Sequence, residues 1–291
     1  MAGLSSGFAN VARTRANTGL PSRHFRHLAP RRRVCPATIT KLIEIGDISA
    51  AELLRDAIDR FGSAFAVVTS FQDEGMVLVD LAARMLPHVR VLTVDTGRLP
   101  AATGEMIGIV ERRYDLAVEV IRPDAAEVAA MVSRFGVDLF REDTAFRRLC
   151  CQVRKVRPLE AALSGAMEGV PDVRAWASGL RREQAESRRD IPRAEESDGR
   201  LKLYPLADWT RAEVAAYIRE NRVPRHPLYE AGYTSIGCDP CTRAVGPGED
   251  ERAGRWWWER DTAKECGIHF TPDGHAERRV DVLLREVLAA R

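Results

Sequence analysis

Apolar and polar positions along the chain from residue 46 onward fall into alternating helix and strand patterns. Ser49 followed by Glu52 forms a capping-box pattern, which predicts the start of a helix. Five apolar residues then recur on one helical face before Gly62, where the helix can end: Leu53, Leu54, Ala57, Ile58 and Phe61. The next run, 65–71, is apolar and β-branched without alternation, as expected for a strand that is covered on both faces. The ordered part of the chain is therefore predicted to begin with a helix and a buried strand.

The rest of the pattern extends this alternation. It predicts helices over 76–86, 101–114, 210–221 and 276–290, a helix that contains the cysteine pair 150–151 and continues to 158, and strands over 89–95, 117–122, 175–180 and 201–206. Strands that alternate with such helices indicate right-handed βαβ units, hence an α/β fold with a doubly wound, mainly parallel sheet. Residues 183–199 are charged and Ser-rich, which predicts an exposed loop. Residues 223–270 are irregular, and a segment of that length needs something to organise it.

Composition and charge divide the chain into three parts. With 291 residues, 45% of them hydrophobic, the chain can bury a large core. Eight of its 44 Lys and Arg residues precede Glu44, the first acidic residue, so the remainder carries 36 basic and 42 acidic side chains. We expect 1–45 to be a basic, disordered leader, with targeting or anion contact as alternatives. We expect 46–270 to be the main domain, with an irregular C-terminal segment, and 271–291 to be a closing helix.

The same features bear on location and partners. No stretch approaches the roughly 18 consecutive apolar residues of a membrane span, and nothing after the leader resembles a sorting signal. We therefore expect a cytoplasmic protein with no membrane partner. The acidic balance of the body argues against an extended basic footprint, so we also expect no nucleic-acid partner.

The cysteines are grouped rather than spread. They comprise an adjacent pair, a C-x-x-C pair and two single residues: Cys150 and Cys151, Cys238 and Cys241, and Cys35 and Cys266. In a chain without a signal peptide, such grouping favours metal ligation or catalysis over structural disulfides. Four thiolates from two pairs suit either zinc or an iron-sulfur cluster, and the spacing by itself favours structural zinc. A strained vicinal disulfide between the adjacent cysteines is a third alternative.

Polar residues follow two of the predicted parallel strands. Ser70 lies at the end of the first strand, and Asp95 ends the second. Ligands of doubly wound sheets bind at the carboxyl ends of the strands, so both residues should lie on one rim. A nucleotide-binding rim is one interpretation, and the alternative is that these side chains only cap helices and form turns.

Positively charged side chains accumulate near these motifs. They are Arg154, Lys155, Arg181, Arg182, Arg243, Arg252 and Arg255. A guanidinium group donates in pairs to phosphate or sulfate oxygens, and lysine supplies a compact charge. Lys155 follows Cys151 by one helical turn, so it could neutralise an anionic cluster or substrate. Its alternative role is that of a solvated helix charge.

Cys266 lies apart from both cysteine pairs, in the segment 265–269. A thiolate there could act as a nucleophile, although a free cysteine is more often a small buried hydrophobe. His269 invites a Cys-His interpretation, but three residues of a flexible segment do not fix hydrogen-bond geometry. We interpret His269 as structural.

Taken with these motifs, the sequence resembles the assimilatory adenylyl-sulfate reductases of bacteria, within the larger phosphoadenylyl-sulfate reductase family. The resemblance covers residues 46–270. Its markers are the joint order of six segments: 94–97, 150–156, 179–184, 233–243, 252–258 and 265–269.

The resemblance implies an adenine nucleotide alpha hydrolase-like sheet and the reduction of adenosine 5'-phosphosulfate to sulfite and AMP in sulfate assimilation. It implies one 4Fe-4S cluster per subunit in place of zinc, held by Cys150, Cys151, Cys238 and Cys241. It assigns the nucleophile to Cys266, which becomes an S-sulfocysteine that a separate thioredoxin reduces. It assigns substrate contact to six residues: Ser70, Asp95, Lys155, Arg181, Arg252 and Arg255. A homo-oligomer is compatible with the family by analogy.

Two departures and several alternatives accompany this resemblance. The loop 70–75 lacks the glycine-rich Ser-Gly-Gly-x-Asp-Ser pattern of related ATP-cleaving enzymes, so ATP hydrolysis is not expected. Only 25 residues follow Cys266, so no fused thioredoxin-like domain is expected. The nearest alternative is a reductase of 3'-phosphoadenylyl sulfate, or of both nucleotides. An RNA-binding sulfur-insertion enzyme and a non-catalytic redox sensor are more distant alternatives.

Overall fold

Six strands form one sheet in the order β3-β2-β1-β4-β6-β5. The computed structural model describes residues 48–197, 199–259, 265 and 275–290, all within one unit that spans 34–291. The strands are β1 (Phe65–Val68), β2 (Arg90–Val94), β3 (Val118–Ile121), β4 (Ala175–Ala177), β5 (Ala194–Ser197) and β6 (Arg200–Leu203). Five are parallel to their neighbours, and β5 pairs antiparallel with β6. The order grows outward in both directions from β1, which confirms the predicted doubly wound, mainly parallel sheet.

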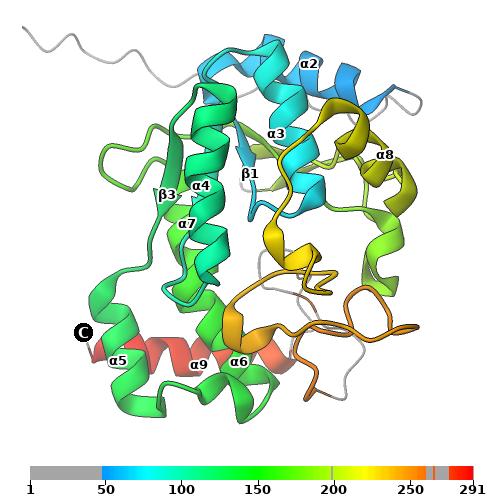
Figure 1. Ribbon diagram of the computed structural model, residues 1–291. Helices are drawn as coiled ribbons and strands as arrows, with labels where there is room; N and C mark the ends of the chain where they lie inside the picture. The colour runs from blue at the N-terminus through cyan, green and yellow to red at the C-terminus, as the bar shows by residue number, and fades with distance from the viewer. Residues whose placement is uncertain (1–47, 198, 260–264, 266–274, 291) are drawn as a thin grey trace, which may run out of the picture. The chain divides into compact units, whose positions relative to one another are not determined.

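Helices cover both faces of the sheet (Figure 1). Their bounds are α2 (Ala50–Phe61), α3 (Asp73–Met85), α4 (Ala101–Tyr114), α5 (Ala125–Phe135), α6 (Thr144–Cys151), α7 (Arg157–Leu163), α8 (Arg211–Asn221) and α9 (His275–Ala289). Short helical turns lie at η1 (Gly62–Ala64), η2 (Leu139–Arg141), η4 (Arg182–Gln184), η5 (Glu186–Arg188), η6 (Pro227–Tyr229) and η7 (Asp239–Cys241). In the described part of the chain, no helix combines the length and apolar character needed to traverse a bilayer.

Alternating side chains of β1 explain why its sequence is apolar throughout. Phe65 and Val67 pack into a core shared with α2, α3, α4 and α8. Ala66 points to the other face, where it shares a core with Leu159 of α7 and Trp176 of β4. Because neither face meets water, both sets of positions must be apolar. The predicted buried strand is thus confirmed, although β1 ends three residues earlier than the apolar run.

A separate apolar cluster joins α5, α6 and α9 near the cysteine pairs. It contains Cys150, Cys241 and Trp256, together with Met131 of α5 and Val287 of α9. Figure 1 shows these three helices gathered at one end of the view, beyond the sheet. The predicted closing helix is confirmed and has a clear packing role, because its apolar face completes this cluster.

Three features differ from the sequence expectations. The segment expected to be an exposed loop, 183–199, contains η5 and the edge strand β5, in which Ala194 is buried. The helix that follows Cys151 does not stop at Pro158. It passes through the π-helical turn η3 (Gln152–Val156) and continues as α7, in whose first turn Pro158 needs no backbone hydrogen-bond partner. Helix α5, which begins after the capping residue Asp124, had no counterpart among the predicted elements.

Candidate functional site

A cavity opens at the carboxyl ends of β1 and β4, where the strand order reverses. Its walls include Thr69 and Ser70 after β1 and Ser178 and Gly179 after β4. The space inside it, counted together with its mouth that opens to solvent, is about 1070 Å³. We call it the rim cavity. Its position is the one that a doubly wound sheet offers to a nucleotide.

Glycine lets the segment after β4 come close enough to the first turn of α3 to form this wall. A Cβ atom at Gly179 would lie 2.8 Å from Cβ of Glu74 and 2.9 Å from the backbone nitrogen of Gly75. Backbone atoms cannot move aside as a flexible side chain can, so a larger residue would push α3 away from β4. The close approach places the first turn of α3 directly on the cavity wall, where Glu74 is one of the lining residues.

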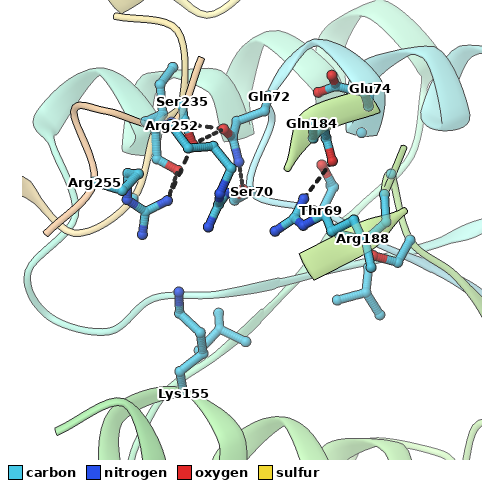
Figure 2. A pocket seen from close by; sticks show the side chains of 18 of the residues that line it. Thr69, Ser70, Gln72, Glu74, Lys155, Gln184, Arg188, Ser235, Arg252 and Arg255 are labelled. Carbon is cyan, nitrogen blue, oxygen red and sulfur yellow. Dashed lines mark hydrogen bonds between the residues drawn. The ribbon is translucent and has the colours of Figure 1, made fainter. Parts of the chain in front are cut away.

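Four cationic side chains surround the rim cavity: Lys155, Arg188, Arg252 and Arg255. In Figure 2, Lys155 rises from the helical segment η3 below, while Arg252 and Arg255 lie across the cavity from it. Arg255 is held within hydrogen-bond distance of Ser235 Oγ (3.5 Å) and the Ile236 carbonyl (3.4 Å). Cations supplied from different elements can bind several oxygens of one extended oxyanion.

The cations are positioned by neighbouring polar groups. Gln72, which precedes α3, accepts a hydrogen bond from the backbone of Ile236 at 2.7 Å and thereby ties the loop after β1 to the segment before η7. Arg188 bonds Gln184 and also pairs with the Glu265 carboxylate through two contacts of 2.7 Å. Burial raises the pKa of Glu265, but Arg188, Arg252 and Ser187 together lower it by more, so the net pKa lies below its ordinary value.

All four paired cysteines line a second cavity, which we call the cysteine cavity. Cys150 and Cys151 end α6, and Cys238 and Cys241 come from the turn around η7. Cys150 and Cys151 are not joined by a disulfide, so the vicinal disulfide considered from the sequence is wrong. The fold thus brings together two cysteine pairs that lie 87 positions apart in the sequence, counted from Cys151 to Cys238.

Cations and hydroxyl groups surround the cysteine cavity. Thr96 Oγ1 lies 3.2 Å from Cys238 Sγ, and Arg98 and Arg154 belong to the lining. Burial raises the pKa of Cys150 to about 11, against the opposing effect of Arg154. Burial also raises the pKa of Cys241 to about 12. Thiols in this setting need a strong cationic occupant before they ionise.

The chemistry of the donors around the cysteine cavity can be compared with that of an iron-sulfur cluster. The described residues include no group of three Cys, His, Asp or Glu side chains that is gathered closely enough to hold one metal ion. Two buried donors nearby, Trp256 Nε1 and Arg154 Nε, have no hydrogen-bond partner among the residues that the structure describes. Cluster sulfurs accept hydrogen bonds, so the donor set fits an anionic iron-sulfur group held by the four thiolates.

Lys155 lines both cavities. Its backbone belongs to the π-helical turn η3, which directly follows the adjacent cysteines. A π turn rotates the side chains that follow it relative to a regular helix, and such turns often occur at functional sites. The local sequence therefore places one lysine on the wall between the four cysteines and the rim.

Two of the expected substrate contacts lie elsewhere. Asp95 directly follows β2, at the carboxyl end of the strand as predicted, but it does not line the rim cavity. Its carboxylate accepts a hydrogen bond from the Gly97 backbone at 2.9 Å and pairs with Arg122 at 3.4 Å. Arg181 is fully buried, and its guanidinium bonds Glu74 at 2.8 Å and Glu251 at 3.2 Å. Its donors face carboxylates of two acids that line the cavity, and Arg181 is not itself among the lining residues. By contrast, Ser70, Lys155, Arg252 and Arg255 all line the rim cavity. Contact of these residues, Asp95 and Arg181 with a substrate stays a prediction.

Other predictions fall outside the described residues. Cys266, Cys35 and the leader 1–45 belong to these stretches, and the division of the chain at 45 and 270 stays a prediction. The fold also supplies site residues that the sequence did not reveal. Arg188 lies in the segment predicted to be an exposed loop, and Gln72 has no motif of its own. The only available signal for Arg188 was its position a few residues after the marker segment 179–184.

Comparisons with known proteins agree with this geometry. Residues 64–244 match the family model described as Phosphoadenosine phosphosulfate reductase domain. The chain is 44% identical over 236 residues to a protein named Adenosine 5'-phosphosulfate reductase from Allochromatium vinosum, covering 80% of this chain and 89% of the relative. It is 46% identical over 185 residues to a protein of the same name from Rhizobium tropici, covering 63% and 99%. Its fold resembles the phosphoadenylyl-sulfate reductase of Candida auris in a phosphate complex, with a TM-score of 0.58 and 28% identity over 73% of this chain and 98% of that one.

Proposed function

Since this chain belongs to the phosphoadenosine phosphosulfate reductase family, we propose that it reduces adenosine 5'-phosphosulfate to sulfite and AMP in sulfate assimilation. One observation carries the proposal: the rim cavity and the cysteine cavity share Lys155 as a common wall. This chemistry requires a binding site for an anionic nucleotide next to the four cysteines. The relatives that share this sequence pattern are named after the same substrate.

The rim cavity would bind the phosphosulfate through its cations. Lys155, Arg252 and Arg255 approach from two sides, and Ser70 offers a hydroxyl at the end of β1. Negative charge on the AMP leaving group grows as the sulfur-oxygen bond breaks. Cationic donors placed beforehand stabilise that charge, and each well-placed donor is worth about 3 kcal/mol.

Cys266 would be the nucleophile. Its thiolate attacks the substrate sulfur, a sulfur-sulfur bond forms, and the bond from sulfur to the bridging oxygen breaks, so that AMP leaves with that oxygen. The product on the protein is an S-sulfocysteine. A thiolate of reduced thioredoxin then attacks Cys266 Sγ and releases sulfite, and the second thioredoxin thiol restores the Cys266 thiol. The two electrons come from the thioredoxin dithiol, and we expect the reaction in the cytoplasm, where such thiols stay reduced.

The four paired cysteines would hold a 4Fe-4S cluster. The unpartnered Trp256 Nε1 and Arg154 Nε and the nearby Thr96 hydroxyl fit such a group. When bound, the cluster would supply an electrostatic field beside the phosphosulfate without carrying electrons in the reaction. Lys155 would partly neutralise the negative charge of both the cluster and the phosphosulfate, because it borders each cavity.

Sulfite formation from adenosine 5'-phosphosulfate, measured with and without thioredoxin, tests the proposal. We expect multiple turnovers only with thioredoxin, and a Cys266→Ser chain that forms no sulfite yet keeps nucleotide binding and visible absorbance. Near-normal turnover by that variant would reject Cys266 as nucleophile. Mass spectrometry after incubation with substrate alone should find a sulfonate group on the peptide that contains Cys266.

The alternative substrate is 3'-phosphoadenylyl sulfate, the nucleotide in the name of the structurally similar protein from Candida auris. A side-by-side comparison of kcat/KM for the two nucleotides separates the candidates. We expect a clear preference for adenosine 5'-phosphosulfate, and equal values would indicate dual specificity.

A further inference from the structure

Glu265 is held at both its main chain and its side chain, although it immediately precedes Cys266 in the sequence. It is 5% exposed. Its carboxylate contacts Arg188 at 2.7 Å through each oxygen and Arg252 at 3.4 Å, and it accepts a bond of 3.0 Å from the Ser187 hydroxyl. Its backbone carbonyl accepts a bond of 3.0 Å from Arg147.

These partners belong to the two cavities. Arg188 and Arg252 line the rim cavity, and Arg147 lines the cysteine cavity. Arg147 is itself fixed, because its guanidinium lies 4.3 Å from the centre of the Trp256 ring and also pairs with Glu259. One residue thus connects the nucleotide side of the site with the cysteine side.

The Glu265 carboxylate has two physical consequences. As a buried anion it must keep its cationic partners, so it fixes the position of its own backbone. Adjacent Cα atoms are about 3.8 Å apart across a trans peptide, so an anchor on Glu265 restrains the start of the segment that carries Cys266. The same carboxylate occupies donors of Arg188 and Arg252 that an oxyanion in the rim cavity would otherwise use.

We propose that Glu265 is a positioning residue that anchors the main chain next to Cys266 in the sequence and competes with the anionic nucleotide for Arg188 and Arg252. The inference rests on the proposed function. It gives Glu265 two effects of opposite sign: the carboxylate speeds sulfur transfer to Cys266, and it weakens binding of the nucleotide. A residue that only stabilises the fold would affect both in the same direction.

The test is Glu265→Gln, which keeps the size of the side chain and removes its charge. Single-turnover formation of the Cys266 sulfonate, followed by mass spectrometry without thioredoxin, should slow at least tenfold. Equilibrium binding of adenosine 5'-phosphosulfate, measured with Cys266→Ser in both chains to prevent reaction, should tighten about three- to tenfold. The matched control is Glu286→Gln, which removes another Arg–Glu pair: Glu286 lies 2.6 Å from Arg134, and neither residue lines either cavity. The control should change neither quantity.

The outcomes separate the possibilities. Unchanged transfer, or binding that weakens together with transfer and the midpoint of thermal unfolding, would overturn the inference. If the glutamine variant does not fold, Glu265→Asp decides in its place, because it keeps the charge but shortens the reach. Sulfur transfer to Cys266 should then slow, while the affinity for adenosine 5'-phosphosulfate stays within about twofold of that of the unaltered chain. Equal transfer rates in the two chains would contradict the anchoring role of Glu265. Absence of sulfite formation by the unaltered chain would instead reject the proposed function.

Discussion

Lys155 shows how much one residue can contribute when a fold places it between two sites. Its backbone lies in η3, and its side chain borders both cavities. Replacing it with methionine keeps most of the volume and removes the charge. We expect kcat for sulfite formation from Lys155→Met to fall about 10²-fold or more, because charge on the leaving group loses a stabilising cation. Iron content and visible absorbance should stay unchanged, and a fall in both would show that the lysine acts on cluster retention instead.

Arg181 illustrates the opposite case, a cation whose donors are used inside the protein. Its guanidinium is fully buried between Glu74 and Glu251. Arg181→Gln would leave the buried Glu74 carboxylate and the half-buried Glu251 carboxylate without this partner, which costs about 3–5 kcal/mol of unfolding free energy. Urea denaturation measures this loss. Arg219→Gln, at an exposed position on α8, should shift the same free energy by no more than about 0.5 kcal/mol.

Part of the site could be predicted from the types of residue in the sequence. Cysteine pairs and arginines near the C-terminal marker segments carry recognisable chemistry, and the fold places Lys155, Arg252 and Arg255 where that chemistry predicts. Arg188 and Glu265 could not be selected in this way. Their importance comes from a pairing across 77 positions that exists only in the folded chain.

At the scale of elements, capping boxes predicted the starts of α2 and α8. Both capping boxes, Ser49 with Glu52 and Thr210 with Glu213, are formed as predicted. Strand β5 was missed because its sequence, AEES, has a single apolar residue and gains its place only by pairing with β6. The π-helical turn was missed because no local periodicity distinguishes it from a regular helix.

Gly237 provides a test at the scale of the loop that carries the second cysteine pair. A Cβ atom there would lie 2.3 Å from Arg255 Nη2 and 2.5 Å from its Cζ. We expect Gly237→Ala to displace the Arg255 guanidinium and to weaken binding of adenosine 5'-phosphosulfate about tenfold, as measured by calorimetry. Gly104→Ala is the control, because a Cβ atom added at this position of α4 would meet open space within 4 Å. Helix propensity predicts a slight stabilisation for the control and no change in affinity.

At the scale of the whole molecule, the sheet core and the cluster around the cysteines are separate packing units. The sheet core requires no cofactor, since it consists of aliphatic and aromatic side chains from the strands and their covering helices. The second cluster includes two of the proposed metal ligands, Cys150 and Cys241, among its buried residues. Stability should therefore be distributed unevenly between the two units.

Cluster removal tests this division. The loaded protein should contain about four iron and four sulfide per chain. After removal by a chelator and an oxidant, amide hydrogen exchange should accelerate in α5, α6 and α9, because their shared apolar cluster loses its cross-link. Exchange in β1 and β2 should stay nearly unchanged. Uniform acceleration throughout the described residues would show that the two packing units unfold together.

The wall that both cavities share has a thermodynamic consequence. A cation that attracts occupants on its two sides makes their affinities interdependent, and the coupling free energy is the same whichever occupant arrives first. The factor by which a bound cluster changes the affinity for the nucleotide must therefore equal the factor by which a bound nucleotide changes the affinity for the cluster. By this reciprocity, a cell that supplies more substrate would also alter how firmly the protein retains the proposed cluster.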